Sequence, residues 1–518
     1  MPRKLNTMER RARRDVKNRS LARNLTAKQK EAEKLGNLGD AGGKYPSGAK
    51  AHGDSADSIR GLKPPSPSRS NSLTVKKAGS VRTKTAAAKA AEPQLVEIEK
   101  PIYGGAFLAR AEGKAVFVPL TLPGEQARVR ITESKHGYAT AEAEEIVRAA
   151  PERIAPACQH FGACGGCNYQ HTNYATQLAW KQAILRETLE RGGVEAPAEI
   201  AVLAGEPQTQ SWHYRNRIRL AFDAAGNPGY RGRRSHGIIA IGECHIAAPL
   251  LVRAALAAAE LLRGFAPDFR PAEISLFCSA EETELLASVF TAGAKSIGFD
   301  ELAKALSERI PQLKGAELVA EGSKAEQART IAQWGAASLT YRAAGFDFRV
   351  DHGAFFQVNR WLVDALVERV TGGHRGELAW DLFAGVGLFA RSLAASFARV
   401  VAVESAPSAT EALAANLKGT TGSAVRSTTV EFLRSSCKSG RPGLIVVDPP
   451  RTGLGPEITS LLGTVAAPAL AYVSCDPATL ARDLRALIGS GYAIQSVTLA
   501  DLFPQTFHLE TVVQLRRS

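Results

Sequence analysis

A cysteine at the end of an apolar segment has the position that covalent chemistry requires. Cys475 follows residues 469–473, whose run of apolar side chains predicts a buried strand. Residues 477–488 have the composition of a helix and begin with proline. Because a helix N-terminus lowers the pKa of a nearby thiol, we expect Cys475 to carry a raised fraction of thiolate. A buried cysteine is more often a packing residue, but this position favours a nucleophile.

Carboxylates stand at two further positions near the end of the sequence. Asp448 follows an apolar segment and precedes two prolines and Arg451. Since prolines leave a sheet, Asp448 is expected at the end of a strand. Amino-methyltransferases of adenine carry an aromatic residue where Arg451 stands, which argues against adenine as the substrate. His508 and Glu510 share a face of an extended chain, and Glu510 is either a general base or a solvated charge.

A glycine turn indicates a cofactor site. Gly385 and Gly387 lie in the segment Asp-Leu-Phe-Ala-Gly-Val-Gly, between a predicted strand and a predicted helix. Glycine lets the backbone approach a ligand closely. Glu404 ends the next apolar segment, 17 residues after Gly387, and can accept two hydroxyl hydrogen bonds from a ribose. The same geometry serves dinucleotides, but the short Gly-x-Gly favours S-adenosylmethionine. A turn chosen only for packing would leave Glu404 unexplained.

A group of cysteines points to metal rather than to disulfides. Cys158, Cys164 and Cys167 lie within ten residues, and Cys244 follows in a Gly-Glu-Cys-His segment. Four thiolates can bind either a 4Fe–4S cluster or zinc. A zinc ribbon normally brings two Cys-x2-Cys hairpins, and one is present here. Radical S-adenosylmethionine enzymes use Cys-x3-Cys-x2-Cys, which differs from this spacing.

The elements around these motifs predict an α/β fold for residues 346–518. Apolar strand-like segments alternate with helix-like ones, which is typical of a doubly wound, Rossmann-like parallel sheet. Ligands of such sheets bind at the carboxyl ends of the strands. The glycine turn, Glu404, Asp448 and Cys475 each follow such a segment, so we expect them to share one edge.

Upstream of residue 346 the composition predicts three more segments. Residues 91–150 alternate apolar and polar residues between glycine and proline turns, which predicts a small five-stranded barrel of the oligonucleotide-binding kind. Residues 151–345 are interpreted as a middle α/β domain that contains the grouped cysteines. Residues 1–90 are expected to form a disordered basic tail, because they are rich in Lys, Arg, Gly, Ser and Pro.

The charge of the chain is concentrated in that tail. Residues 1–90 hold 22 Lys and Arg against 7 Asp and Glu, a net charge of +15, so the remainder of this +14 chain carries −1. A basic arm suits a polyanion because it releases counterions on binding phosphate. A solvated extension without a specific partner accounts for the charge equally well.

Several motifs taken together resemble a known family. In order along the chain they read QVN at 357–359, DLFAGVGLF, VVAVE, DPPRTGLG, YVSCDPATLARDL and FPQTFHLETVVQL. They are similar to the RNA uracil-5-methyltransferases over about residues 95–518. The segments YGGAFLAR and GKAVFVPLTLPGE resemble a TRAM domain, an RNA-binding barrel. The spacing of the cysteines resembles the iron–sulfur site of the branch of this family that acts on ribosomal RNA.

The resemblance implies roles for individual residues. It assigns Cys475 as the nucleophile and Glu510 as the general base. It implies contacts to S-adenosyl-L-methionine from Gln357, Phe383, Glu404 and Asp448, beside the turn of Gly385 and Gly387. Leu388 stands where some members have asparagine. It also implies a 4Fe–4S cluster on Cys158, Cys164, Cys167 and Cys244.

Three functions follow as hypotheses. The first is methylation of carbon 5 of a uridine in 23S rRNA, after addition of the Cys475 thiolate to carbon 6. The second is the same reaction on transfer RNA. The third is a catalytically inactive RNA-binding factor of ribosome assembly, against which the presence of Cys475, Glu510 and Asp448 argues. We expect a cytoplasmic protein without a membrane span or an obligate protein partner, because the sequence shows neither a long apolar stretch nor a secretory signal.

Overall fold

The computed structural model describes residues 92–517 with three gaps, at 266, 323–327 and 437–439. All of them fall within one of the two compact units of the chain, residues 49–518. The predicted basic tail, residues 1–90, lies outside the described residues.

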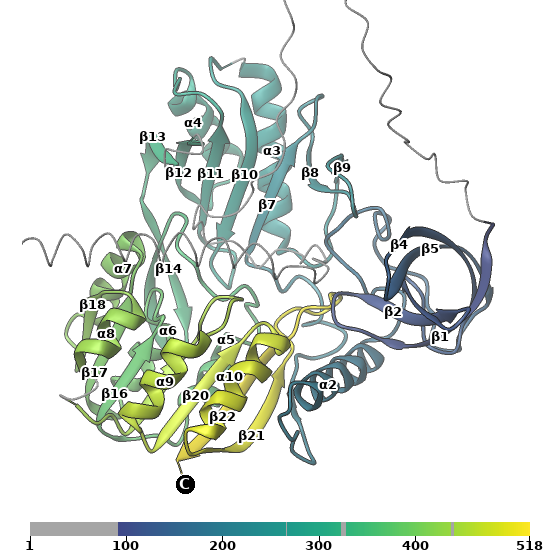
Figure 1. Cartoon of the computed structure of the whole chain (residues 1–518). Coiled ribbons are helices and arrows are strands. Elements are labelled where there is room, and N and C mark those ends of the chain that lie inside the picture. Colours follow the sequence, from purple (N-terminus) through teal and green to yellow (C-terminus); the bar gives the residue numbers. More distant parts are fainter. Residues whose placement is uncertain (1–91, 266, 323–327, 437–439, 518) are drawn as a thin grey trace, which may run out of the picture. The chain divides into compact units, whose positions relative to one another are not determined.

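A closed barrel of five strands begins the described chain (Figure 1). Its order is β1-β2-β3-β5-β4, with β3 and β5 parallel. Alternate residues point inward, and Ile98, Phe107 and Val118 are among the buried side chains of the barrel core. The predicted barrel is thereby confirmed. The strands are β1 (Gln94–Pro101), β2 (Ala106–Ala111), β3 (Lys114–Pro119), β4 (Gln126–Ser134) and β5 (Tyr138–Arg148).

A second sheet has seven strands in the order β13-β12-β11-β10-β7-β8-β9. Helices α3 (Pro249–Phe265) and α4 (Phe299–Arg309) pack against it and against each other. The alanine-rich face of α3 allows this close packing, because Ala254, Ala255 and Ala258 are all buried in the shared core. The strands are β7 (Arg217–Phe222), β8 (Pro228–Arg231), β9 (Ile238–Ala240), β10 (Pro271–Cys278), β11 (Leu285–Thr291), β12 (Leu313–Ala320) and β13 (Arg329–Gly335).

The third sheet has eight strands in the order β18-β17-β16-β19-β20-β22-β21-β6. Strands β16 to β20 run parallel, and β22 runs antiparallel between β20 and β21. This is the predicted Rossmann-like sheet, which is confirmed. The strands are β6 (Ala201–Leu203), β16 (Gly376–Leu382), β17 (Phe397–Glu404), β18 (Gly422–Arg426), β19 (Leu444–Val447), β20 (Ala469–Ser474), β21 (Tyr492–Ala500) and β22 (Glu510–Arg517).

Apolar cores form on both faces of this sheet. One core includes buried residues of α5 (Val363–Thr371), α6 (Leu388–Leu393), α7 (Pro407–Leu417) and the hairpin of β14 (Ser338–Ala343) and β15 (Phe346–Asp351). The other includes α2 (Tyr174–Arg191), α8 (Thr429–Ser436), α9 (Gly455–Val465) and α10 (Pro477–Gly489). Helix α2 and strand β6 come from the segment interpreted as the middle domain, yet they pack with the C-terminal sheet.

Among the helices that the structure describes, none combines the length and apolar composition that crossing a lipid bilayer requires.

Candidate active site

The strands of the C-terminal sheet bring the predicted site residues to one edge. Leu382 of β16 pairs with Val447 of β19, and Val447 pairs with Tyr472 of β20. The residues that follow these strands therefore emerge at the same level. Phe383, Asp448 and Cys475 all follow at this edge, as the carboxyl ends of parallel strands predict.

The two glycines of the cofactor turn differ in their surroundings. Gly385 has φ +55, and a Cβ added there would meet no described atom within 4 Å, so its backbone faces open space. Gly387 has φ +95, and its Cβ would lie 2.6 Å from Leu413 of α7. Gly387 is therefore required for packing, whereas Gly385 leaves room beside the turn.

The Glu404 carboxylate is hydrogen-bonded to the backbone of this turn. Its Oε2 accepts a hydrogen bond from the Gly385 backbone N–H at 3.0 Å. Its Oε1 accepts from the backbone N–H groups of Ser405 and Ala406, both at 2.7 Å. A carboxylate offers about four acceptor positions, and the fourth is taken only by a long bond of 3.4 Å from the Ser405 hydroxyl, which a ligand hydroxyl can replace. The space beside Gly385 and this acceptor fit an adenosyl ligand.

Asp381 is a buried carboxylate at the same edge that the sequence analysis did not select. Its Oδ2 accepts from the Ala390 backbone N–H at 2.8 Å, while Oδ1 finds no hydrogen-bond partner among the described residues. Burial is the main cause that raises the pKa of Asp381 to about 7; the hydrogen bond from Ala390 opposes this rise, and the charges of Asp448 and Glu404 add to it. In the sequence, the position of Asp381 at the start of the glycine motif is the feature that could have identified it.

Gln357 reaches Asp448 from the segment that follows β15. Its buried side chain donates from Nε2 to Asp448 Oδ2 at 3.4 Å. Its backbone carbonyl accepts from Asn216 Nδ2 at 2.8 Å. Asn359 donates from Nδ2 to the Leu502 carbonyl at 3.2 Å. The Gln-Val-Asn segment therefore links the strand end of β19 to the loop that precedes β22.

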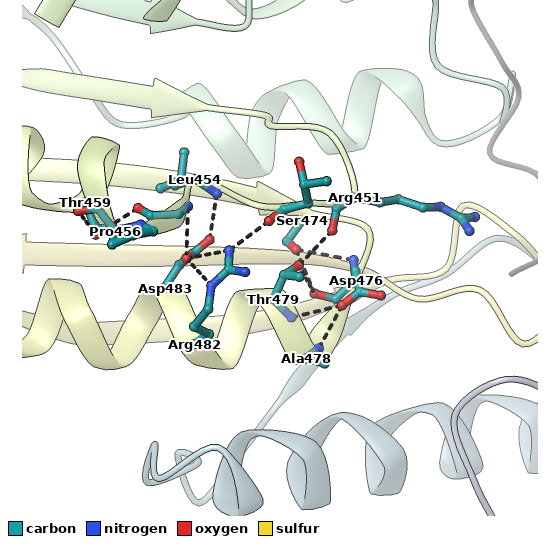
Figure 2. A network of polar contacts seen from close by, with 12 residues as sticks. Arg451, Leu454, Pro456, Thr459, Ser474, Asp476, Ala478, Thr479, Arg482 and Asp483 are labelled. Atoms are coloured by element: carbon teal, nitrogen blue, oxygen red, sulfur yellow. Dashed lines mark hydrogen bonds and ion pairs between the residues drawn. The ribbon is translucent and has the colours of Figure 1, made fainter. Parts of the chain in front are cut away.

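Cys475 is buried at the start of α10, as predicted, with 4% of its surface exposed. The next residue, Asp476, is the N-cap of that helix. Its Oδ1 accepts from the backbone N–H groups of Ala478 and Thr479, at 3.1 and 2.9 Å (Figure 2). A thiol beside such a helix start lies in a field that favours the thiolate.

The Asp-Pro-Pro-Arg loop is fastened to the same helix. Thr479 Oγ1 donates to the Arg451 carbonyl at 3.1 Å. Asp483 accepts from the backbone N–H groups of Leu454 and Gly455 and from the Tyr472 hydroxyl. Figure 2 shows the bonds that join the loop to Thr479 and Asp483 of α10, with the Arg451 guanidinium directed away from them. The loop is consequently bound to α10, the same helix whose first residues follow Cys475.

The antiparallel ladder of β20 and β22 ends beside Cys475 and Glu510. Its last pair is Ser474 with Thr511, which Cys475 follows on one chain segment and Glu510 precedes on the other. Glu510 is 3% exposed. His508 lies close by, with its Nδ1 3.4 Å from Arg451 Nη2. The two residues predicted to be catalytic thus both adjoin the last pair of this ladder.

The four grouped cysteines lie within electrostatic range of one another. Each is a partly exposed residue with a free thiol. The pKa values of Cys158, Cys164 and Cys167 are all raised, that of Cys164 to about 11. Burial is the main cause in each case, and the nearby Cys244 contributes. Within the described ranges no group of three or more His, Cys, Asp or Glu side chains is arranged to hold a metal ion. The set has the donors of an iron–sulfur site but not, as placed, its geometry.

Comparison with known proteins agrees with this fold. The family model described as tRNA (Uracil-5-)-methyltransferase matches residues 302–518, and the TRAM domain model matches residues 91–143. The chain is 33% identical to the 23S rRNA (uracil(1939)-C(5))-methyltransferase RlmD of Chromohalobacter salexigens, over 82% of this chain and 89% of that protein. It is also 33% identical to an uncharacterized RNA methyltransferase of Streptomyces avermitilis, over 81% and 97%.

A solved structure shares the fold. The Pyrococcus abyssi tRNA (uracil-54, C5)-methyltransferase in complex with S-adenosyl-L-homocysteine superimposes with a TM-score of 0.67, at 24% identity, over 81% of this chain and 99% of that one. The resemblance read from the motifs is confirmed, including the TRAM barrel. The chain therefore belongs to the RNA uracil-5-methyltransferase family.

Proposed function

We propose that this enzyme methylates carbon 5 of a uridine in 23S rRNA, with S-adenosyl-L-methionine as the methyl donor. The observation that supports the proposal is the pairing of Ser474 with Thr511 at the end of the ladder that Cys475 and Glu510 adjoin. Relatives named for 23S rRNA align with more than four-fifths of the chain, for example over 82%. Transfer RNA is less favoured, and the complete set of site residues argues against an inactive assembly factor.

In the proposed mechanism Cys475 makes the uracil reactive. Carbon 5 of uracil is a weak nucleophile, so direct methylation is slow. The Cys475 thiolate adds to carbon 6, and the electrons of the carbon 5–carbon 6 double bond move to the carbonyl oxygen at carbon 4 as an enolate. The cofactor supplies, when bound, an electrophilic methyl group on a sulfonium. Carbon 5 of the enolate would take this methyl group, and the electron pair of the broken carbon–sulfur bond would stay on the cofactor sulfur, which would leave as a neutral thioether.

Glu510 completes the proposed reaction. Its carboxylate removes the proton from carbon 5, the double bond to carbon 6 forms again, and the bond from carbon 6 to sulfur breaks to release the Cys475 thiolate. To reach the buried thiol the uridine must leave its stack. The stacking cost is smaller for a single-stranded RNA segment than for a duplex.

For the cofactor we propose contacts from Gln357, Phe383, Glu404 and Asp448 around the open space at Gly385, with Gly387 shaping the turn. Leu388 is buried in the core of the sheet, so this position offers the cofactor no polar contact. We also propose that Cys158, Cys164, Cys167 and Cys244 bind a 4Fe–4S cluster, because these four free thiols are the donor set that such a cluster uses. The reaction above needs no redox centre, so the role would be structural.

Trapping with a modified substrate tests the function. RNA fragments of 23S rRNA that contain 5-fluorouridine should form a denaturation-resistant adduct with the wild-type enzyme and S-adenosyl-L-methionine, because fluorine cannot leave as a proton does. Cys475→Ala should form none. Cys278→Ala, which changes another buried cysteine in β10, is the matched control and should form the adduct. An adduct with Cys475→Ala would remove this residue from the mechanism, and adduct formation only with transfer RNA would change the substrate.

A further inference from the structure

The barrel extends a tyrosine to the proposed active site. Tyr103 lies in the turn between β1 and β2 and packs against both the barrel core and the core around α10. Its ring meets Phe507 edge-on, with centroids 5.8 Å apart. Gly105 of the same turn has φ +83, and a Cβ there would lie 3.0 Å from the Phe507 ring and 3.1 Å from Asn168. Only glycine allows so close an approach of this turn to Phe507.

The hydroxyl of Tyr103 is directed at the residue after the nucleophile. It donates to Asp476 Oδ2 at 3.4 Å. The other oxygen of that carboxylate caps α10 through Ala478 and Thr479. Burial raises the pKa of Tyr103, the charge of Asp476 raises it further, and that of Arg451 opposes the rise, so the hydroxyl stays protonated at neutral pH. One carboxylate therefore joins the barrel to the helix start that carries Cys475.

Tyr103 thus contacts the two chain segments that carry the residues we propose to be catalytic. Its hydroxyl holds Asp476, which follows Cys475 directly. Its ring rests on Phe507, which precedes His508 and lies three residues before Glu510. The Cys475-to-Glu510 distance depends on where these two segments sit. A small displacement of reacting groups is enough to slow a positioned reaction substantially.

We infer that Tyr103 is a positioning residue, through which the RNA-binding barrel sets the geometry between the Cys475 thiol and the Glu510 carboxylate. The inference rests on the proposed function. It means that the barrel contributes to the chemical step in addition to binding RNA. The TRAM domain would then be coupled to the reaction through this hydroxyl and this ring contact.

The test separates the chemical step from RNA binding. Tyr103→Phe keeps the ring contact and removes the hydroxyl. At saturating 5-fluorouridine RNA and S-adenosyl-L-methionine, its rate of adduct formation should fall roughly fivefold, the scale of one ordinary hydrogen bond. The dissociation constant for RNA should stay unchanged. Tyr138→Phe, the same change on β5 away from the site, should leave the rate unchanged.

A second variant shows whether the hydroxyl acts through Asp476. Asp476→Asn keeps a carbonyl oxygen to cap α10 but replaces the oxygen that accepts from Tyr103. In this background Tyr103→Phe should slow adduct formation less than about twofold, because the interaction is already lost. If Tyr103→Phe slowed adduct formation by the same factor in the Asp476→Asn variant as in the wild type, the inference would be overturned. A wild-type rate in Tyr103→Phe, or an effect confined to RNA affinity, would also overturn it. If the wild-type enzyme itself forms no adduct, the proposed function fails, and this inference with it.

Discussion

Lys181 and Asp501 form an ion pair that solvent does not reach. The Lys181 Nζ lies 2.6 Å from Asp501 Oδ1, and both side chains are fully buried. Lys181 also donates to the Phe503 carbonyl at 2.9 Å, and the Tyr174 hydroxyl donates to Asp501 Oδ2 at 2.8 Å. Burial lowers the pKa of Lys181, and the charge of Asp501 opposes this. The pair anchors the loop between β21 and β22 to α2. This loop leads into Glu510, the first residue of β22.

Breaking this pair should destabilise the protein strongly. Lys181→Met leaves the Asp501 carboxylate buried without its cation, which should lower the free energy of unfolding by about 3 kcal/mol. Arg309→Met breaks a solvent-exposed pair with Glu260 and is the matched control, with a loss of at most about 1 kcal/mol. Urea denaturation measures both. Equal losses in the two variants would contradict the anchoring role of the buried pair.

Asp381 should make stability fall as the pH rises. The folded protein holds this carboxyl protonated up to a pKa of about 7, above its ordinary value of 3.8. The folded state therefore binds more protons between these values, so the stabilisation is complete below pH 4 and is lost as the pH rises to 7. Asp381→Asn keeps an acceptor for Ala390 and has no charge to bury. Its melting temperature relative to wild type should be higher at pH 8 than at pH 5, and a constant difference would contradict the shift.

The open space at Gly385 should be required for the cofactor. Gly385→Ala puts a methyl group into that space and should weaken S-adenosyl-L-methionine binding at least tenfold in calorimetry. Gly419→Ala is the control, because Gly419 has a similar positive φ of +75 and likewise no atom within 4 Å of its Cβ. Both variants should lose about 1 kcal/mol of stability from backbone strain. Wild-type affinity in Gly385→Ala would place the cofactor elsewhere.

Glu510 should act after methyl transfer. Glu510→Gln removes the base but keeps the shape, so the methylated intermediate should persist with unmodified RNA as a protein–RNA adduct on a denaturing gel. Turnover should fall by about 100-fold or more, the usual scale for a lost general base. Glu457→Gln on α9 changes a half-exposed carboxylate and should turn over normally. Normal turnover by Glu510→Gln would transfer the role to another residue, with His508 the first to test.

The grouped cysteines should bind iron and sulfide. Protein purified without oxygen should be brown and contain about four iron and four sulfide per chain. Cys167→Ala should lose both, because it removes one of the four ligands, whereas Cys278→Ala should retain them. One zinc per chain without sulfide would contradict the cluster. Elemental analysis and the visible spectrum make this test independent of enzyme activity.

Much of the active site could be predicted from local sequence. Apolar runs predicted the parallel strands, a glycine turn predicted the break before α6, and proline after Asp476 predicted the start of α10. The carboxyl ends of parallel strands meet at one edge for any such sheet, so Phe383, Asp448 and Cys475 were expected together. The family motifs then supplied the roles proposed for Cys475 and Glu510.

Other features were decided only by the tertiary structure. Strand β6 joins the C-terminal sheet beside β21, although its sequence lies in the segment interpreted as the middle domain. The cysteine spacing indicated a cluster, yet the described positions of these thiols do not form a metal-holding group. Neither Asp381 nor Lys181 was selected from the sequence, because a residue's burial is set by the elements that pack over it.

The same holds for the contacts that tie the site together. Lys181 and Asp501 are 320 residues apart, and Tyr103 and Asp476 are 373 apart. Periodicity, capping and turn residues encode structure over a few neighbours along the chain. Which distant side chains meet depends on how helices and sheets pack as whole bodies and on which buried polar groups must then find a partner. The sequence by itself therefore determined the elements and their motifs, and packing decided which of them share a site.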